Sequence, residues 1–186
     1  MKKIVLYLMI LFILTGNAAF AQKKAPGFTD LMDQIRMGEK EKVAEIITQS
    51  PGFLKLRDAD GQTPMMKAIY YQRYEIAKYL LESGSDVKTT DKNRQTPIHL
   101  AAEKGMTMIL QPLINRGANV NCKDKDGNTP LHLAAARNKE YAAKTLLENG
   151  AKPNDKNLKG QTPLTVASKD QNMEVMDVIK KFGGKF

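Results

Sequence analysis

The chain has 186 residues, of which 42% are hydrophobic, and 29 Lys and Arg against 20 Asp and Glu give a formal net charge of +9. This length suits one domain or one array of repeats. The single cysteine excludes an internal disulfide, so packing must hold the folded state together. The positive charge aids solubility and favours acidic proteins or an anionic surface as partners.

The first 21 residues have the layout of a secretory signal peptide. Lys2 and Lys3 form a basic start, an eleven-residue apolar run covers 4–14, and Ala19-Phe20-Ala21 is a small-x-small cleavage site. The run is shorter than the roughly 20 residues of a membrane span, and no cysteine follows it that could carry a lipid. We expect cleavage after Ala21, which leaves 165 residues with a charge of +7. Retention as an uncleaved anchor is the alternative.

Export would place the protein in the periplasm or outside the cell. The lysine-only basic start is typical of bacterial signals and favours the periplasm. No stable membrane anchor is expected after cleavage. An exported protein does not normally meet nucleic acid, so we expect no nucleic-acid partner.

Beyond this segment, the dipeptide Thr-Pro recurs four times at intervals of 33 residues. A glycine follows each threonine after 21 residues, so two independent markers keep the same period. The markers are Thr63, Thr96, Thr129 and Thr162, with Gly84, Gly117, Gly150 and Gly183. A fixed period of this length is typical of solenoid repeat proteins.

Each Thr-Pro pair predicts the start of a first helix, because threonine is a good N-cap and proline suits the first helical position. Small and apolar residues follow at helical spacing, as in 98–102 and 131–135. A second apolar stripe, such as that of Ile76, Ala77 and Leu80, predicts a second helix. The period glycine is expected to end that helix in a left-handed conformation.

Tight-turn signals precede three of the Thr-Pro pairs, at Asp60-Gly61, Asp126-Gly127 and Lys159-Gly160. Arg94 replaces the glycine in the remaining turn, and Asn93 becomes the candidate for the positive φ there. We interpret carboxylate pairs in these turns, such as Asp58 and Asp60, as turn residues and not as catalytic pairs.

The segments QTPIHLAAEKG and NTPLHLAAARN, with their 33-residue period, resemble the T-P-L-H-x-A pattern of the ankyrin repeat. The resemblance covers about residue 28 to the C-terminus. It implies an all-α solenoid of about five helix-turn-helix repeats with short β-hairpin fingers, capped at both ends. It also implies protein binding, without naming a partner.

The expected organisation is a signal peptide over 1–21, a short linker over 22–27 and an ankyrin-repeat domain over 28–186. The repeats are expected at 28–57, 58–90, 91–123, 124–156 and 157–186. The first unit lacks Thr-Pro and has highly charged helices, which suits an N-terminal cap with one solvated face. The last unit is the expected C-terminal cap, with Glu174, Asp177, Lys180 and Lys181 facing water.

Nothing in the sequence predicts a catalytic residue, a metal site or a cofactor. Phosphate-loop, nucleophile-elbow and His-Glu-x-x-His motifs are absent. The two histidines, His99 and His132, occupy the T-P-x-H position, whose histidine bonds within and between repeats in the family. We assign both this structural role. Cys122 is interpreted as a buried thiol, with pairing to another chain as the alternative.

The resemblance implies recognition through a concave face made of the fingers and the first helices. Positions on this face, Gln62 among them, carry seven basic and four acidic residues, so the face leans positive. The two tyrosines among them are candidate hot-spot residues, and the alternative is that one of them packs against a neighbouring helix. The partner-binding candidates are Tyr70, Tyr71, Lys92, Arg94, Lys104, Lys125, Arg137, Leu158 and Lys159.

The leading hypothesis is an exported, monomeric ankyrin-repeat module that engages a protein partner. One alternative is a binder of anionic envelope material such as lipopolysaccharide or acidic polymer, through the net charge. Another is an immunity or stabilising partner of a neighbouring gene product. An enzyme is not expected, given this inventory of residues.

Overall fold

The computed structural model describes residues 27–186, so the predicted signal peptide lies outside the described residues. This part of the chain contains ten α-helices in five consecutive pairs, and one 3-10 helix. The first helices of the pairs are α2 (Phe28–Met37), α4 (Pro64–Tyr70), α6 (Pro97–Lys104), α8 (Pro130–Ala136) and α10 (Pro163–Lys169). The second helices are α3 (Lys40–Gln49), α5 (Tyr74–Glu82), α7 (Thr107–Asn115), α9 (Glu140–Glu148) and α11 (Met173–Lys181), and the 3-10 helix η1 (Pro51–Lys55) follows α3.

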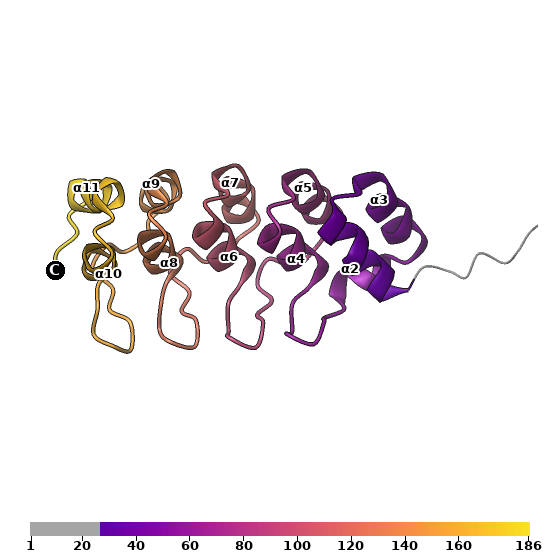
Figure 1. The fold of residues 1–186 in the computed structure, drawn as a ribbon, viewed down its shortest axis with the longest axis horizontal. Coiled ribbons are helices and arrows are strands. Elements are labelled where there is room, and N and C mark those ends of the chain that lie inside the picture. The colour runs from indigo at the N-terminus through magenta and orange to yellow at the C-terminus, as the bar shows by residue number, and fades with distance from the viewer. Residues whose placement is uncertain (1–26) are drawn as a thin grey trace, which may run out of the picture.

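The pairs stack side by side in chain order, which gives a layer of first helices and a layer of second helices (Figure 1). Contacts run between neighbouring pairs, as between α6 and α8 or α7 and α9. The loops between pairs project from the first-helix layer, away from the second helices (Figure 1). This arrangement confirms the predicted all-α repeat solenoid.

The Thr-Pro pairs start the first helices as predicted. The Oγ1 of Thr63 accepts from the backbone N–H of Met66 at 3.3 Å, and the Oγ1 of Thr162 accepts from that of Thr165 at 3.2 Å. The following proline occupies the first turn of each helix, where a missing N–H leaves no bond unmade. The four period glycines have φ between +82° and +95° after the second helices, also as predicted.

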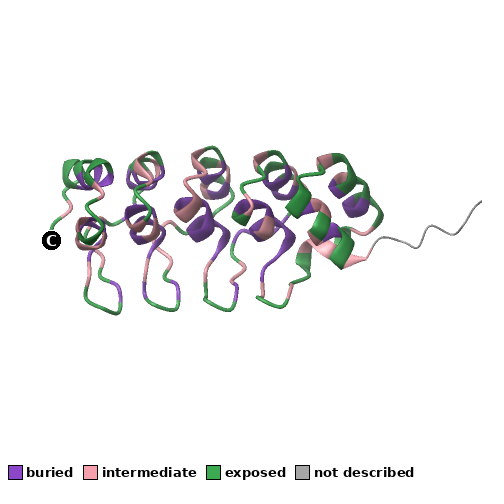
Figure 2. Ribbon diagram, in the orientation of Figure 1, coloured by how far each residue is buried: buried purple, intermediate pink, exposed green. Residues whose placement is uncertain are grey.

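The core lies between the two layers, and Figure 2 shows its buried residues along the facing sides of the helices. Alanines such as Ala101 and Ala134 are fully buried and let the first helices approach closely. Larger side chains such as Leu110 and Leu146 fill the space beneath the second helices. Burial of each such leucine contributes roughly 1.5–3 kcal/mol. The charged residues of α11 at positions 174, 177, 180 and 181 are exposed, as expected of a terminal repeat.

The projecting loops are hairpin-shaped, but no strand is assigned anywhere in residues 27–186. We keep the word finger for these loops: finger 1 is 58–62, finger 2 is 91–95, finger 3 is 124–128 and finger 4 is 157–161. Each finger closes with one backbone bond between its ends, as from the N–H of Asp58 to the carbonyl of Gln62 at 3.0 Å. One such bond is too few to form a strand ladder, so the expected β-hairpins are reduced to turns. In the first repeat, η1 precedes finger 1.

No helix in residues 27–186 combines the length and the apolar character that crossing a membrane requires.

Candidate partner-binding face

Every finger is built on the same side-chain turn. The first residue of each finger is an aspartate or asparagine whose Oδ1 accepts from the backbone N–H groups two and four residues ahead, at 2.8–3.0 Å. The four residues are Asp58, Asp91, Asp124 and Asn157. The predicted role of the first carboxylate of each pair as a turn residue is therefore confirmed. Asp60 and Asp126 remain exposed near the finger tips.

Finger 1 is also tied to its own first helix by Lys67 of α4. The Nζ of Lys67 lies 2.9 Å from Oδ2 of Asp58 and 3.5 Å from Oδ2 of Asp60. Burial alone would raise the pKa of Asp58, but the Lys67 ammonium and the backbone N–H groups of Gln62 and Asp60 outweigh it and lower the pKa. Burial alone would lower the pKa of Lys67, but the hydrogen bond and the charge of Asp58 outweigh burial and raise it. The pair holds finger and helix together.

Neighbouring fingers are joined in a fixed register. The N–H of Lys92 donates to the carbonyl of Asp60 at 3.1 Å, and that of Lys125 to Asn93 at 2.9 Å. The N–H of Leu158 completes the series with the carbonyl of Asp126, at 3.0 Å. The four fingers thus form one continuous row whose backbone is held from finger to finger.

Gln62 was expected on the binding face, and this expectation is wrong. Its side chain is buried, because the Nε2 donates to Oδ2 of Asp91 in finger 2 at 3.3 Å. A similar bond, from Nδ2 of Asn157 to Oδ1 of Asn128 at 2.9 Å, joins fingers 3 and 4. The bases of the fingers are therefore used for internal contacts, and the tips are left for solvent.

The two histidines connect each middle repeat to the next finger. The Nδ1 of His99 accepts from the N–H of Thr96 at 3.2 Å, and its Nε2 lies 3.1 Å from the carbonyl of Asn128. His132 repeats this with Thr129 and with the carbonyl of Gln161, at 3.2 and 3.0 Å. Burial lowers the pKa of both rings, although the carbonyl contacts oppose this. The predicted structural role of both histidines is confirmed.

Cys122 is only partly buried and lies beside this histidine network. Its Sγ is 3.4 Å from Oγ1 of Thr96 and 3.6 Å from Nδ1 of His99. Burial raises the pKa of the thiol, which disfavours the reactive thiolate. Among residues 27–186, no three or more His, Cys, Asp or Glu side chains are grouped to hold a metal ion.

The two candidate tyrosines have different environments at the end of α4. Tyr70 is 45% exposed, and Nζ of Lys104 lies 4.5 Å from the centre of its ring. Tyr71 is half-buried, packs against the core and lines a hollow of about 260 Å³ with Met32 of α2. The two rings contact each other edge to face, with centroids 5.2 Å apart. Of the two, Tyr71 is therefore the one that packs, and Tyr70 is the one that is presented.

Lys104 and Arg137 meet in a second hollow of about 260 Å³, next to Tyr70. Glu103 also lines it and accepts from Nε and Nη2 of Arg137 at 3.2 and 3.1 Å. Lys139 contributes a further cation to the same lining. The structure thus brings Tyr70, Tyr71, Lys104 and Arg137 together at the C-terminal ends of the first helices.

The remaining candidates lie on the fingers. Lys92, Arg94, Lys125 and Lys159 are exposed, and Leu158 is 79% exposed. Arg94 itself has a φ of +59°, so the expectation that Asn93 would take this conformation is wrong. Finger and first-helix residues share one side of the molecule: Lys159, Asp126 and Ala136 line a common hollow of about 170 Å³. We call this side the finger face.

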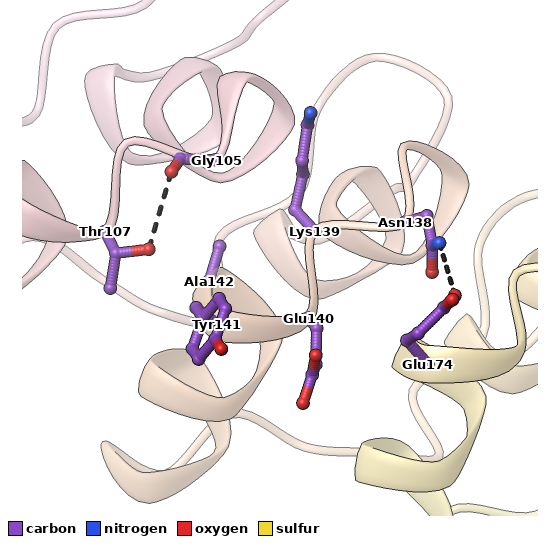
Figure 3. A pocket seen from close by; sticks show the side chains of 8 residues that line it. All are labelled: Gly105, Thr107, Asn138, Lys139, Glu140, Tyr141, Ala142 and Glu174. Carbon is purple, nitrogen blue, oxygen red and sulfur yellow. Dashed lines mark hydrogen bonds between the residues drawn. The ribbon is translucent and has the colours of Figure 1, made fainter.

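A further hollow of about 210 Å³ lies away from the fingers, at the turns between first and second helices (Figure 3). Sequence reasoning gave none of its lining residues a binding role, and Glu174 was expected only to face water. Nδ2 of Asn138 donates to Oε2 of Glu174 at 2.6 Å, while Lys139 and Glu140 point in opposite directions (Figure 3). Because its polar groups do not converge, the hollow has no catalytic arrangement.

Comparison with protein families identifies the repeats. A model described as ankyrin repeats (3 copies) matches residues 83–157, and one described as ankyrin repeats (many copies) matches residues 54–101. The chain matches no curated protein sequence. Ankyrin repeats are typically protein–protein interaction modules and binding scaffolds without catalysis of their own. Since the two matches together span more than half of the sequence, the chain belongs to the ankyrin-repeat family.

Proposed function

We propose that this chain is an exported module that engages a protein partner through its finger face. The observation that carries the proposal is the difference between the bases of the fingers and their tips. Their backbone and basal side chains are bonded internally, as in the contact of Gln62 with Asp91, while large or charged side chains at the tips are exposed. A rigid row with unused tips is suited to recognition, because little conformational freedom is lost on binding.

Tyr70 supports the same face. Tyrosine offers a large, rigid apolar body with a polar tip, and such residues are enriched among binding hot spots. The Lys104 ammonium over its ring and the edge contact of Tyr71 hold the side chain in place before any partner arrives. Arg137 and Lys104 supply charged groups at its border.

Export is part of the proposal and follows from the first 21 residues alone. The basic start, the eleven-residue apolar run and the Ala-x-Ala site predict a mature protein that begins at Gln22. N-terminal sequencing of exported material tests this. Full-length protein retained in the membrane fraction after carbonate extraction would show that the segment is an uncleaved anchor.

Binding of anionic envelope material is the second candidate, since the expected mature chain carries a charge of +7. The finger tips argue against a uniform anionic ligand, because Asp60 and Asp126 interrupt the cations. A role as an immunity or stabilising partner of a neighbouring gene product would use the same protein-binding activity.

Affinity capture from an envelope extract with the immobilised protein tests the proposal. We expect a protein to be retained, with reduced affinity but continued binding at about 0.5 M salt, where the Debye length falls to a few ångströms. Capture of lipopolysaccharide or acidic polymer alone, lost at that salt concentration, would favour the second candidate instead. A variant with Tyr70 replaced by alanine identifies whether the captured protein uses the finger face.

A further inference from the structure

The cations on fingers 2 and 3 have no anionic partner within residues 27–186. The ion pairs of this region involve helices or finger 1, as in Lys40 with Glu75 or Lys67 with Asp58. None includes Lys92, Arg94 or Lys125. Within residues 27–186, the only side-chain hydrogen bond of these three is that from Nζ of Lys125 to Oδ1 of Asn93, at 3.5 Å. Three exposed positive charges are thus left free on adjacent finger tips.

Arg94 is in addition held in an unfavourable backbone conformation. Fingers 1, 3 and 4 have Gly61, Gly127 and Gly160 at the equivalent position, with φ of +79°, +76° and +71°. Arg94 adopts φ of +59° without being a glycine, and its guanidinium makes no hydrogen bond within residues 27–186. No hydrogen bond from the side chain to the described residues offsets this strain, so the guanidinium is available to a partner.

The positive φ of Arg94 is explained by its position next to finger 3. A Cβ on Gly61 would lie 3.2 Å from the backbone N of Lys92, so this site faces the next finger. Arg94 occupies the same site facing finger 3, and the bond from Lys125 N–H to the carbonyl of Asn93 is nevertheless kept at 2.9 Å. The finger-to-finger register therefore accounts for the conformation of Arg94, whose side chain is exposed on finger 2.

Exposed cations lie on fingers 2, 3 and 4, where Lys159 is the cation of finger 4, and finger 1 has none. The second residue of each finger is, in order, Ala59, Lys92, Lys125 and Leu158. A ligand that runs along the tips meets cations on fingers 2 and 3 and an exposed leucine on finger 4. The acidic residues at 60 and 126 would repel a long uniform polyanion, whereas a short acidic stretch on fingers 2 and 3 avoids Asp60 of finger 1.

We propose that the partner presents a short acidic peptide segment to Lys92, Arg94 and Lys125, followed by an apolar residue that packs on Leu158. The inference rests on the proposed function and specifies the chemistry of the partner. Arg94 is the specificity-determining residue, because a guanidinium fork binds a carboxylate through two parallel hydrogen bonds. Lys92 and Lys125 act as point charges that attract the segment.

Fluorescence anisotropy with a labelled 14-residue peptide tests this. The peptide carries four glutamates followed by Leu-Phe, and its control has glutamine in place of each glutamate. At about 50 mM salt we expect saturable binding of the glutamate peptide to the purified protein, and binding of the glutamine peptide at least tenfold weaker, which corresponds to the loss of a charge-assisted hydrogen bond. Absence of saturable binding, or equal binding of both peptides, would overturn the proposal.

Variants assign the effect to the proposed residues. Arg94→Gly keeps the turn and should weaken binding about tenfold, and Arg94→Lys should recover only part of this loss because it lacks the fork. Lys92→Glu with Lys125→Glu should reverse the preference toward a peptide with four lysines. Lys78→Gln, an exposed lysine of α5 without an ion pair, is the matched control and should bind as the unaltered protein does. Unaltered affinity in Arg94→Gly would overturn the assignment.

Further outcomes distinguish an acidic polymer from an acidic peptide as the ligand. They also distinguish failure of the acidic-segment inference from failure of the proposed function. Polygalacturonate that binds more tightly than the peptide, in an Arg94-dependent manner, would show that the site takes an acidic polymer. A captured partner that is lost on Tyr70→Ala but unaffected by changes at Arg94, Lys92 and Lys125 would overturn the acidic-segment inference while the finger face stands. Retention by all of these variants would overturn both.

Discussion

The Nε2 of His99 lies 3.1 Å from the carbonyl oxygen of Asn128, which ends the next finger. The Nδ1 of the same ring accepts from the backbone N–H of Thr96 at 3.2 Å. Nε2 must then carry the proton and donate, so both contacts are satisfied by the neutral imidazole. An added proton on Nδ1 would break the bond at the start of α6. His132 has the same arrangement with Gln161.

We therefore expect the protein to lose stability between pH 7 and pH 5. Burial lowers the pKa of both histidines in the folded state, below the value of about 6.5 in the unfolded chain. The unfolded chain then binds more protons in this interval, so stability is fully present above about pH 6.5 and falls as the pH drops toward the folded pKa. Urea unfolding at pH 7, 6 and 5 measures the change.

A double variant, His99→Thr with His132→Thr, is the control for this pH dependence. Threonine is a reasonable replacement, because Thr165 holds the equivalent position in the last repeat and its N–H bonds the Oγ1 of Thr162. We expect a lower urea midpoint at pH 7, since two contacts to the next finger are lost. The decline from pH 7 to pH 5 should become much smaller. An unchanged decline would mean that other groups cause it.

Arg94→Gly should stabilise the protein by about 0.5–1 kcal/mol. Glycine adopts positive φ without steric cost, although its greater freedom in the unfolded chain offsets part of the gain. The three other fingers already have glycine at this position. Urea unfolding at pH 7 gives the difference. Combined with weaker peptide binding, a gain in stability would identify Arg94 as a residue kept for recognition.

Gly127→Ala is the opposite change at the same repeat position. The φ of Gly127 is +76°, and an added Cβ would lie 2.8 Å from the backbone N of Leu158. Because both conformation and space oppose the substitution, we expect a loss of roughly 2 kcal/mol or more. A neutral effect here, or a loss of stability in Arg94→Gly, would contradict the strain assigned to finger 2.

Substitutions of Asp58 should separate its two roles. Asp58→Asn keeps the Oδ1 that accepts in the turn, as Asn157 does in finger 4, and loses only the charge attraction to Lys67. We expect it to cost about 1 kcal/mol, because both partners of the pair are mostly buried. Asp58→Ala also leaves the N–H groups of Asp60 and Gln62 without their acceptor and should cost about twice as much.

The pH dependence provides a second measure of this pair. The pKa of Asp58 is lowered in the folded state, so its contribution is present above about pH 4 and disappears as the pH falls through the folded pKa. The difference between the unaltered protein and Asp58→Asn should therefore be the same at pH 7 and pH 5. A difference that already vanishes at pH 5 would contradict the lowered pKa.

Most of the fold could be predicted because its signals are local. A threonine cap, a proline in the first turn and a glycine after the second helix each act within a few residues. Their repetition every 33 residues then fixes the order of helices. The histidine contacts could be expected only through the family resemblance, since Asn128 lies 29 residues from His99.

The errors concern residues whose conformation depends on the next finger. Asn93 tolerates positive φ better than arginine, so local preference pointed to it. The bond from the N–H of Lys125 to the carbonyl of Asn93 fixes the register between fingers 2 and 3. In this register Arg94, and not Asn93, adopts the positive φ. Gln62 is buried for a similar reason, because Asp91 of finger 2 binds its amide. No local signal reports these contacts.

The tyrosine pair supplies the prediction that most directly tests the finger face. Tyr70→Ala should weaken binding of the captured partner by about 2 kcal/mol or more, the usual size of a hot-spot effect. Stability should change little, because the Tyr70 side chain is 45% exposed. Tyr71→Ala should instead lower the urea midpoint, because Tyr71 packs against the core. Titration calorimetry and urea unfolding of the two single variants separate binding from folding.

Lys144→Ala on α9 is the control for the opposite side of the molecule. Lys144 is exposed on the second-helix layer, and its pairing with Glu148 is loose, at 3.9 Å between Nζ and Oε1. Its removal should alter neither stability nor affinity, since such exposed pairs contribute little. Full affinity in Tyr70→Ala together with weaker binding in Lys144→Ala would mean that the partner contacts the second helices. The finger face would then have to be abandoned as the binding site, although the assignment of the repeats would stand.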